Sequence, residues 1–175
     1  MCRAMVFRTA VFVLVIALAL GAPAAAERLA GPARVIDGDT LEVAGTRLRL
    51  AGIDAPEVAQ TCPAEGGGTW PCGAEAAALA RAAVEGRAVT CRTLGPVSWG
   101  RKVALCQMDG ADLGGWLVAE GLAFWAPGYG PDYRAAASAA EAAGRGVWRY
   151  GVAAPAAHRA AAGAAGPPRA GCAIK

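Results

Sequence analysis

The chain is 175 residues long, a length that suits one domain with additional segments. Hydrophobic residues make up 55% of it, but many of them are alanines, so the core that they can build is modest. The formal net charge is +3, and it falls to +1 without Arg3 and Arg8 near the start, which excludes the strongly basic proteins that coat nucleic acid non-specifically. A polyanionic substrate would therefore have to be held by local arginines or by a metal ion.

The first 26 residues are predicted to be a secretory signal peptide. Arg3 and Arg8 form a basic start, an apolar run follows, and the small residues of "APAAA" permit cleavage after Ala26. The alternative is an uncleaved membrane anchor, although the apolar run is short for a helix that spans a bilayer. We therefore expect a periplasmic or secreted protein with no stable membrane association after signal cleavage.

The cysteines of an exported protein are expected to form disulfides. Five follow the predicted signal peptide, and any four of them allow three pairings. Proximity along the chain favours one pair within a loop and one across a hairpin: Cys62–Cys72 and Cys91–Cys106. Cys172 would then be free or intermolecular. A zinc site is disfavoured, because there is no CxxC pair and the only histidine is His158.

The first part of the domain has the patterns of β-strands. Residues 33–43 are apolar on both sides of "DGDT", which predicts a hairpin whose turn is Asp-Gly. In residues 47–50 arginines alternate with leucines, the pattern of a half-buried strand. Pro56 in "DAPE" ends that strand, and an irregular loop rich in glycine and proline follows.

The rest of the domain predicts three helices, with a pair of strands between the first two. The helical patterns end at glycines, and the two β-like runs surround a Gly-Pro loop. Trp148 follows the last helix as an expected anchor in the core. The expected ranges are 73–86, 111–123 and 131–144 for the helices and 87–108 for the strands.

This order of elements predicts an α+β fold, namely a five-stranded β-barrel of the oligonucleotide-binding (OB) type with three α-helices. We expect a signal peptide at 1–26, one domain at 27–150, and an Ala/Gly/Pro-rich tail at 151–175 that is disordered. Nothing in the sequence indicates more than a monomer.

Two short acidic segments, "DGDT" and "DAPE", are the candidates for chemistry. Asp54 and Glu57 lie three residues apart around a proline, and Arg49 lies five residues before Asp54. A hard cation such as Ca²⁺ binds carboxylates, backbone carbonyls and water, which two acidic turns at the ends of neighbouring strands could supply. The alternatives are an ordinary tight turn for "DGDT" and a surface cluster of salt bridges for the whole set.

The ordered set of motifs resembles the staphylococcal-type nucleases (thermonucleases). "VIDGDTLEV", "RLRLAGIDAPE", "WGRKVAL", "LVAEGLA" and "GVW" occur in the order found in that family, over about residues 33–148. The resemblance implies an OB-type barrel of five strands with three helices. It also implies a Ca²⁺-dependent phosphodiesterase that acts on DNA and RNA.

When the roles of the family's motif residues are transferred to the matching positions of this chain, the resemblance implies a metal site and a set of catalytic residues. The carboxylates of Asp39 and Asp54 would hold Ca²⁺, with the backbone carbonyl of Ala55, and Asp37 would lie in the outer part of the site.

Glu57 would orient or deprotonate the attacking water, and Arg49 and Arg101 would bind the phosphate oxygens. Guanidinium forks suit this role because they match phosphate geometry and neutralise the charge that grows on its oxygens during in-line attack.

Trp99 and Tyr129 are the candidates for contact with the substrate. Trp99 stands where the family usually has tyrosine, and it either stacks on a sugar or base or covers the end of the barrel. Tyr129 is expected near the same rim. The family commonly has an aspartate just before this point, where the chain has Val97 and Ser98, and this difference bears on affinity and end preference.

The leading prediction is therefore an exported calcium-dependent nuclease whose partner is nucleic acid, single-stranded or locally open. The alternative is a non-catalytic OB-fold module that binds single-stranded nucleic acid or protein. A third candidate is a barrel that binds oligosaccharide or peptide. Loss of the acids or arginines would favour the last two, and this chain retains them.

Overall fold

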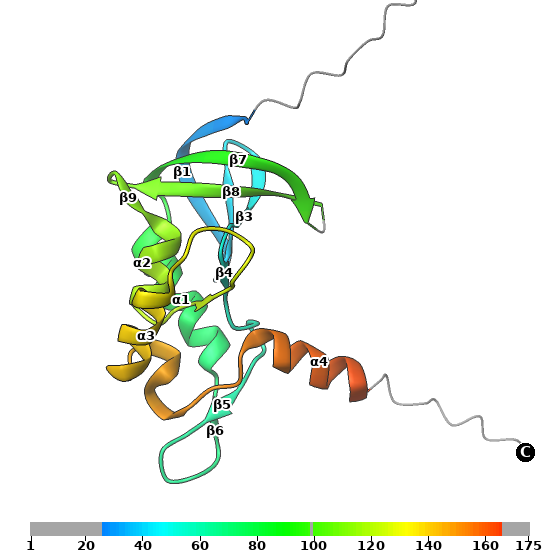
Figure 1. Ribbon diagram of the computed structural model, residues 1–175, viewed down its shortest axis with the longest axis vertical. Coiled ribbons are helices and arrows are strands. Elements are labelled where there is room, and N and C mark those ends of the chain that lie inside the picture. The colour runs from blue at the N-terminus through cyan, green and yellow to red at the C-terminus, as the bar shows by residue number, and fades with distance from the viewer. Residues whose placement is uncertain (1–25, 99, 166–175) are drawn as a thin grey trace, which may run out of the picture.

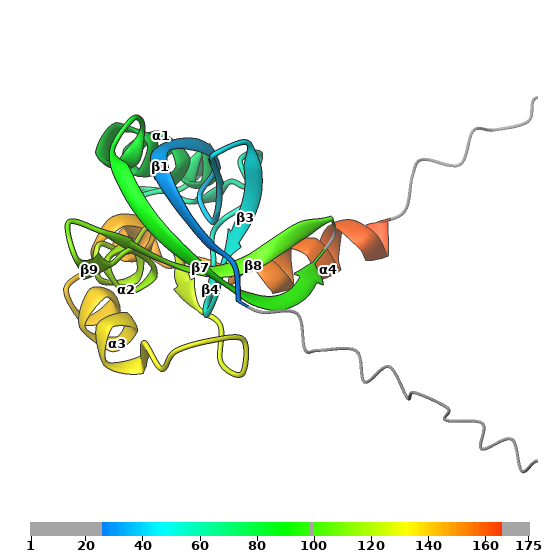
Figure 2. The ribbon, with the colours of Figure 1, turned by 90° about the horizontal axis from the view of Figure 1, so that it is seen from above.

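The computed structural model describes residues 26–98 and 100–165, and a closed β-barrel forms its upper part (Figures 1 and 2). The strands follow the order β3-β2-β1-β7-β8 with antiparallel neighbours, and the parallel pairing of β3 with β8 closes the ring. This arrangement confirms the predicted α+β fold with a five-stranded OB-type barrel. The strands are β1 (Arg28–Asp37), β2 (Thr40–Val43), β3 (Thr46–Leu50), β7 (Ala88–Ser98) and β8 (Arg101–Met108).

The first hairpin is confirmed, but its turn differs by one residue from the prediction. Asp37 pairs with Thr40 across the ladder, so the turn consists of Gly38 and Asp39. The Asp37 carboxylate accepts a hydrogen bond from the Asp39 N–H at 3.1 Å, the Asx interaction that favours such a turn. Asp39 therefore lies at the tip of the hairpin and not within a strand.

One hydrophobic core is shared by the barrel and the helices below it. Along β3 the leucines point inward, and Leu48 is fully buried, whereas Arg47 is exposed and Arg49 half-buried. This alternation confirms the predicted half-buried strand. The largest fully buried side chains of the core include Leu48, Ile53, Leu113, Val43, Val84 and Val118.

The three predicted helices are present and gather at one end of the barrel (Figure 1). Asp112 caps the second of them by accepting a hydrogen bond from the Gly114 N–H. Its other carboxylate oxygen accepts a hydrogen bond from the Tyr133 hydroxyl at 2.6 Å, which ties the start of the third helix to the second. The helices are α1 (Cys72–Val84), α2 (Leu113–Ala119) and α3 (Arg134–Ala142).

Short elements complete the domain and include the predicted anchor. Trp148 packs on Phe124 with 4.7 Å between ring centroids, which fixes the end of the domain under the barrel. These elements are β4 (Ile53–Asp54), β5 (Cys62–Pro63), β6 (Thr69–Trp70), β9 (Ala111–Asp112), β10 (Phe124–Trp125) and the 3₁₀ helix η1 (Gly146–Tyr150).

Both expected disulfides are present. Cys62–Cys72 links the small β5–β6 hairpin to the first residue of α1. Cys91–Cys106 joins two residues that face each other across the β7–β8 ladder. The two disulfides are consistent with an exported protein.

The segment after Gly151 differs from the prediction of a disordered tail. A fourth helix, α4 (Pro155–Ala165), projects sideways from the body of the domain (Figure 1). The alanine content that suggested low complexity also gives high helix propensity, and proline favours the first position of a helix.

Some predictions fall on other parts of the chain. The signal peptide up to residue 25, Trp99 and Cys172 lie outside the described residues. Within residues 26–98 and 100–165, no helix is long and apolar enough to cross a membrane.

Candidate active site

The two acidic segments meet at one edge of the barrel. The Leu50 N–H donates to the Asp39 carbonyl at 2.9 Å, which brings the end of β3 beside the tip of the first hairpin. The chain then passes into β4, which pairs with β10 and so fixes Asp54 opposite Phe124. A hydrogen bond of 3.3 Å from the Ala55 N–H to the Asp39 carboxylate joins the two acidic segments directly.

Asp39 is a buried carboxylate, with 5% of the residue exposed. It accepts hydrogen bonds from the Thr40 hydroxyl at 3.0 Å and from the Ala55 N–H. Burial raises the pKa of the Asp39 carboxyl to about 6, because desolvation disfavours the charged form more than Arg49 and these hydrogen bonds favour it. The neighbouring Asp37 raises this pKa further.

Arg49 bridges the two aspartates that were predicted to hold a cation. Its Nη1 lies 2.9 Å from the Asp39 carboxylate, and its Nη2 lies 2.9 Å from Asp54. Because guanidinium is planar and its nitrogens are fixed relative to one another, this contact also fixes the separation of the two carboxylates. The Arg49 side chain is 23% exposed, so one edge of the site is open to solvent.

Arg101 joins the same site from the neighbouring strand. The parallel pairing of β3 with β8 places the start of β8 beside β3. From there Arg101 donates through Nη1 to the Thr40 hydroxyl at 2.8 Å, and Thr40 in turn donates to Asp39. The two predicted phosphate-binding arginines thus reach Asp39 from different strands.

Glu57 lies on the loop after β4, and its side chain is about half exposed at 47%. The fully buried Gln60 holds this loop, because its N–H donates to the Glu57 carbonyl at 2.7 Å and its Oε1 accepts from the Glu57 N–H at 3.3 Å. The Gln60 Nε2 also donates to the Ala153 carbonyl at 2.9 Å, which connects the Glu57 loop to the segment before α4.

Arg159 on α4 is a member of the site that sequence reasoning missed. Its Nη2 donates to one oxygen of Asp54 at 2.8 Å, and its Nη1 approaches the other oxygen at 3.3 Å. Nη1 also donates to Glu57 at 2.8 Å. A high alanine content after Pro155 was a signal for a helix, but no sequence pattern indicated where that helix docks.

The remaining predicted residues differ in how they relate to the site. Asp37 accepts a hydrogen bond from the Asp39 N–H, and its place in the outer part of a metal site remains a prediction. Ala55 is buried and presents its N–H to Asp39, and its carbonyl remains a prediction as a ligand. Tyr129 is 78% exposed, on a loop whose backbone accepts a hydrogen bond from the Gly52 N–H.

The donor set suits a hard cation, but guanidinium groups separate its members. Arg49 lies between Asp39 and Asp54, and Arg159 lies between Asp54 and Glu57. Accordingly, no group of three or more His, Cys, Asp or Glu side chains in the described part of the chain is arranged to hold a metal ion. The three carboxylates supply only oxygen donors, as Ca²⁺ prefers, so their chemistry fits this ion.

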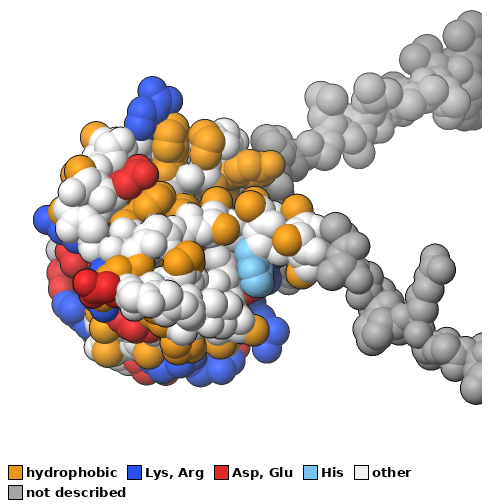
Figure 3. Space-filling model, turned by 90° about the horizontal axis from the view of Figure 1, so that it is seen from below, with side chains coloured by type: hydrophobic (Ala, Val, Ile, Leu, Met, Phe, Trp, Pro, Cys, Tyr) orange, Lys and Arg blue, Asp and Glu red, His pale blue; other side chains and the backbone are white. Residues whose placement is uncertain are grey.

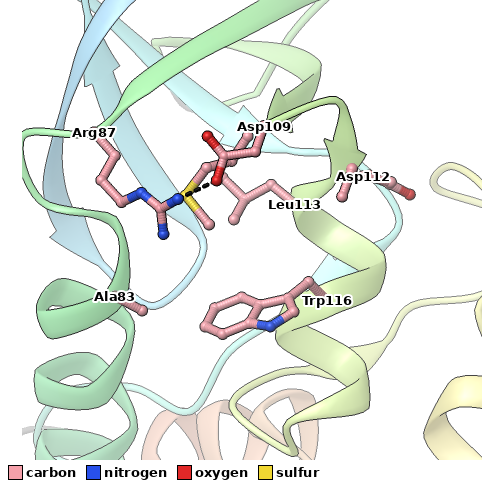
Figure 4. Close-up of a pocket in the computed structure, with 8 residues that line it drawn as sticks. Ala83, Arg87, Asp109, Asp112, Leu113 and Trp116 are labelled. Carbon is pink, nitrogen blue, oxygen red and sulfur yellow. Dashed lines mark hydrogen bonds and ion pairs between the residues drawn. The ribbon is translucent and has the colours of Figure 1, made fainter.

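A cavity among the described residues lies away from this site. It has a volume of about 260 Å³ and lies between the end of α1 and the start of α2, with Trp116 on one side and the ion pair of Arg87 and Asp109 at its rim (Figure 4). None of the predicted site residues lines it. The candidate active site instead lies at the edge of the barrel where the side chains of Arg49 and Glu57 reach solvent.

The raised pKa of Asp39 predicts how stability depends on pH. In calcium-free buffer the folded chain keeps the Asp39 proton up to about pH 6, whereas the unfolded chain releases it near pH 4. This residue therefore makes the free energy of unfolding fall as pH rises from about 4 to about 6. Urea unfolding of wild type and Asp39→Asn across this range measures the contribution. An equal pH slope in both proteins would contradict it.

Comparison with known proteins places this geometry in a family context. The family model described as staphylococcal nuclease homologue matches residues 47–150, which include Arg49, Asp54, Glu57 and Arg101. Over 128 residues the chain is 39% identical to the succinoglycan biosynthesis protein ExoI of Rhizobium meliloti (strain 1021), a match that covers 71% of this chain and 67% of the relative.

Proposed function

The chain belongs to the family of staphylococcal nuclease homologues, and on this premise we propose that it is an exported, calcium-dependent nuclease that hydrolyses phosphodiester bonds of DNA, RNA or both. The observation that carries the proposal is a continuous series of polar contacts. It runs from Arg101 through Thr40 and Asp39 to Arg49, and from there to Asp54. Four residues with roles implied by the family, Arg101, Asp39, Arg49 and Asp54, thus gather at one edge, and Arg159 connects Glu57 to Asp54.

The arginines would bind the phosphate. Contacts with Asp39 and Asp54 use only part of the Arg49 guanidinium, which carries five N–H donors in a planar fork, so further donors are available to an anion. Arg101 offers a second fork from β8. Two such groups favour a pentacovalent phosphorane-like transition state, because its equatorial oxygens carry more charge than those of the bound diester.

Asp39 and Asp54 would hold Ca²⁺, with the Ala55 carbonyl and with Asp37 in the outer part of the site. The ion would supply charge neutralisation at the phosphate oxygens. Glu57 would orient or deprotonate the attacking water, and its exposed carboxylate is accessible for this role. The hydrogen bonds from Gln60 hold the Glu57 backbone, which restricts where that carboxylate can reach.

The open edge suits a single-stranded or locally open nucleic acid. Tyr129 presents most of its ring to solvent, and an exposed ring can stack on a base without sequence preference. Trp99 remains a second candidate for stacking. The two disulfides support function in the periplasm or outside the cell.

The name of the relative supplies a second candidate function, a role in succinoglycan biosynthesis. The 39% identity is high enough for the two chains to share the fold, and it is the observation that favours this candidate. The two candidates differ in substrate, so adding succinoglycan to the assay below separates them.

The test is cleavage of single-stranded DNA and RNA by the oxidised mature chain in calcium and in EDTA. We expect cleavage with calcium only, and we expect Glu57→Gln, purified in parallel, to be at least about a hundredfold slower, which excludes a contaminating nuclease. If folded wild-type protein leaves both nucleic acids intact in calcium, the nuclease proposal is wrong. Shortening of succinoglycan in the same buffer would then favour the second candidate.

A further inference from the structure

Arg159 binds the two carboxylates that the proposed reaction requires to be free. Its guanidinium contacts both oxygens of Asp54, at 2.8 and 3.3 Å, and one oxygen of Glu57 at 2.8 Å. The Asp54 side chain is 13% exposed, and both of its carboxylate oxygens contact this guanidinium. The contact joins residues 105 positions apart in the sequence, and it therefore depends on how α4 docks.

Helix α4 is docked almost entirely at its first turn. Pro155 is fully buried, and the Gln60 side chain holds the preceding residues through the Ala153 carbonyl. From Ala160 to Gly163 every residue is exposed, and the helix leaves the body of the domain with only small apolar side chains scattered along it (Figure 3). Beyond the anchored first turn, the ion pairs of Arg159 are thus the main contacts that hold α4 over the site.

From these contacts we propose that α4 is an intramolecular cap, in which Arg159 competes with a divalent cation for Asp54 and at the same time occupies Glu57. The inference rests on the proposed function, since it concerns the regulation of the same site. Arg49 and Arg159 together donate three hydrogen bonds to the Asp54 carboxylate, which leaves few of its lone pairs for a cation, and the positive charges of Arg159 and the cation repel each other. The capped form therefore binds a cation more weakly than the open form.

Little free energy is needed to release α4 from the site. The Arg159 side chain is 45% exposed, and an isolated helix of 11 residues is marginally stable in water, so releasing α4 removes little buried apolar surface. The anchor at Pro155 and Gln60 stays in place when the arginine leaves. The arginine then remains tethered close to the site and returns when the cation dissociates, which makes the contact reversible.

The test compares calcium binding to wild type and to Arg159→Gln by isothermal titration calorimetry. If the capped form is populated about ten to one over the open form, removing the cap lowers the dissociation constant for calcium about tenfold. Arg92→Gln is the matched control, because it removes the same charge from an exposed position on β7 and should bind calcium like wild type.

Amide hydrogen exchange supplies a readout that does not depend on catalysis. In wild type, calcium should speed exchange in residues 157–163, whereas Arg159→Gln should exchange rapidly there with or without calcium. The cap is refuted if Arg159→Gln binds calcium no more tightly than wild type, or if calcium leaves exchange in wild-type α4 unchanged.

Cleavage assays separate failure of the cap from failure of the proposed function. Equal calcium affinities in two proteins that both cleave DNA would refute the cap and leave the nuclease intact. Tighter calcium binding by Arg159→Gln in the absence of any cleavage would support the cap and refute the nuclease. No calcium binding by either protein would refute both.

Discussion

Replacing Arg49 by alanine is expected to lower kcat/KM for single-stranded DNA by about 10²–10³-fold, the loss typical of removing one preorganised donor to a transition-state oxyanion. Among the residues that the structure describes, Arg49 is the one whose side chain pairs with both Asp39 and Asp54, so the substitution also removes the contact that fixes their separation. Arg49→Lys keeps the positive charge and loses the planar fork. We therefore expect it to keep most of the stability and still lose at least about tenfold in rate.

The matched control for this experiment is Arg47→Ala. Arg47 lies on the same strand, two residues away and therefore on the same face, but it is exposed and outside the site. Single-turnover cleavage at enzyme concentrations below saturation gives kcat/KM, and urea unfolding of each variant distinguishes lost catalysis from lost folding. Near wild-type cleavage by Arg49→Ala, or an equal loss in Arg47→Ala, would show that Arg49 does not bind the phosphate.

The barrel could be predicted because its signals are local. Alternation in residues 47–50, the acidic turn after residue 36 and glycines at the ends of helices each depend on a few neighbouring residues. Which two residues form the first turn was harder to predict from the sequence, because Asp-Gly and Gly-Asp both suit a two-residue loop. The Asx hydrogen bond from Asp39 to Asp37 distinguishes them, and only the folded chain shows it.

Part of the site could be predicted for a related reason. Asp39 lies in the turn between β1 and β2, Arg49 lies near the end of β3, which pairs with β2, and Asp54 follows β3 directly along the chain, so the barrel order and short chain connections bring them together. Arg159 and Gln60 could not be found in this way. Their contacts depend on the docking of α4 and on the packing of a glycine-rich loop, both of which are long-range in the sequence.

The backbone of the Glu57 loop lies very close to Gly73 at the start of α1. A Cβ atom on Gly73 would lie 1.8 Å from the Glu57 carbonyl oxygen and 3.2 Å from the Gln60 nitrogen. Both are backbone atoms, so neither can move aside as a flexible side chain would. The Gly73 N–H also donates to the Gln60 carbonyl at 3.1 Å, which keeps the two segments in contact.

Gly73→Ala should therefore force the Glu57 loop away from α1, lower the free energy of unfolding by about 3 kcal/mol, and reduce cleavage even where the protein remains folded. Gly163→Ala is the control, because it adds the same methyl group to an exposed helical position with nothing within 4 Å. Urea unfolding and cleavage, measured on oxidised protein, give the two effects separately. If Gly73→Ala retains both wild-type stability and wild-type cleavage, the loop tolerates displacement, and the hydrogen bonds from Gln60 do not set the position of Glu57.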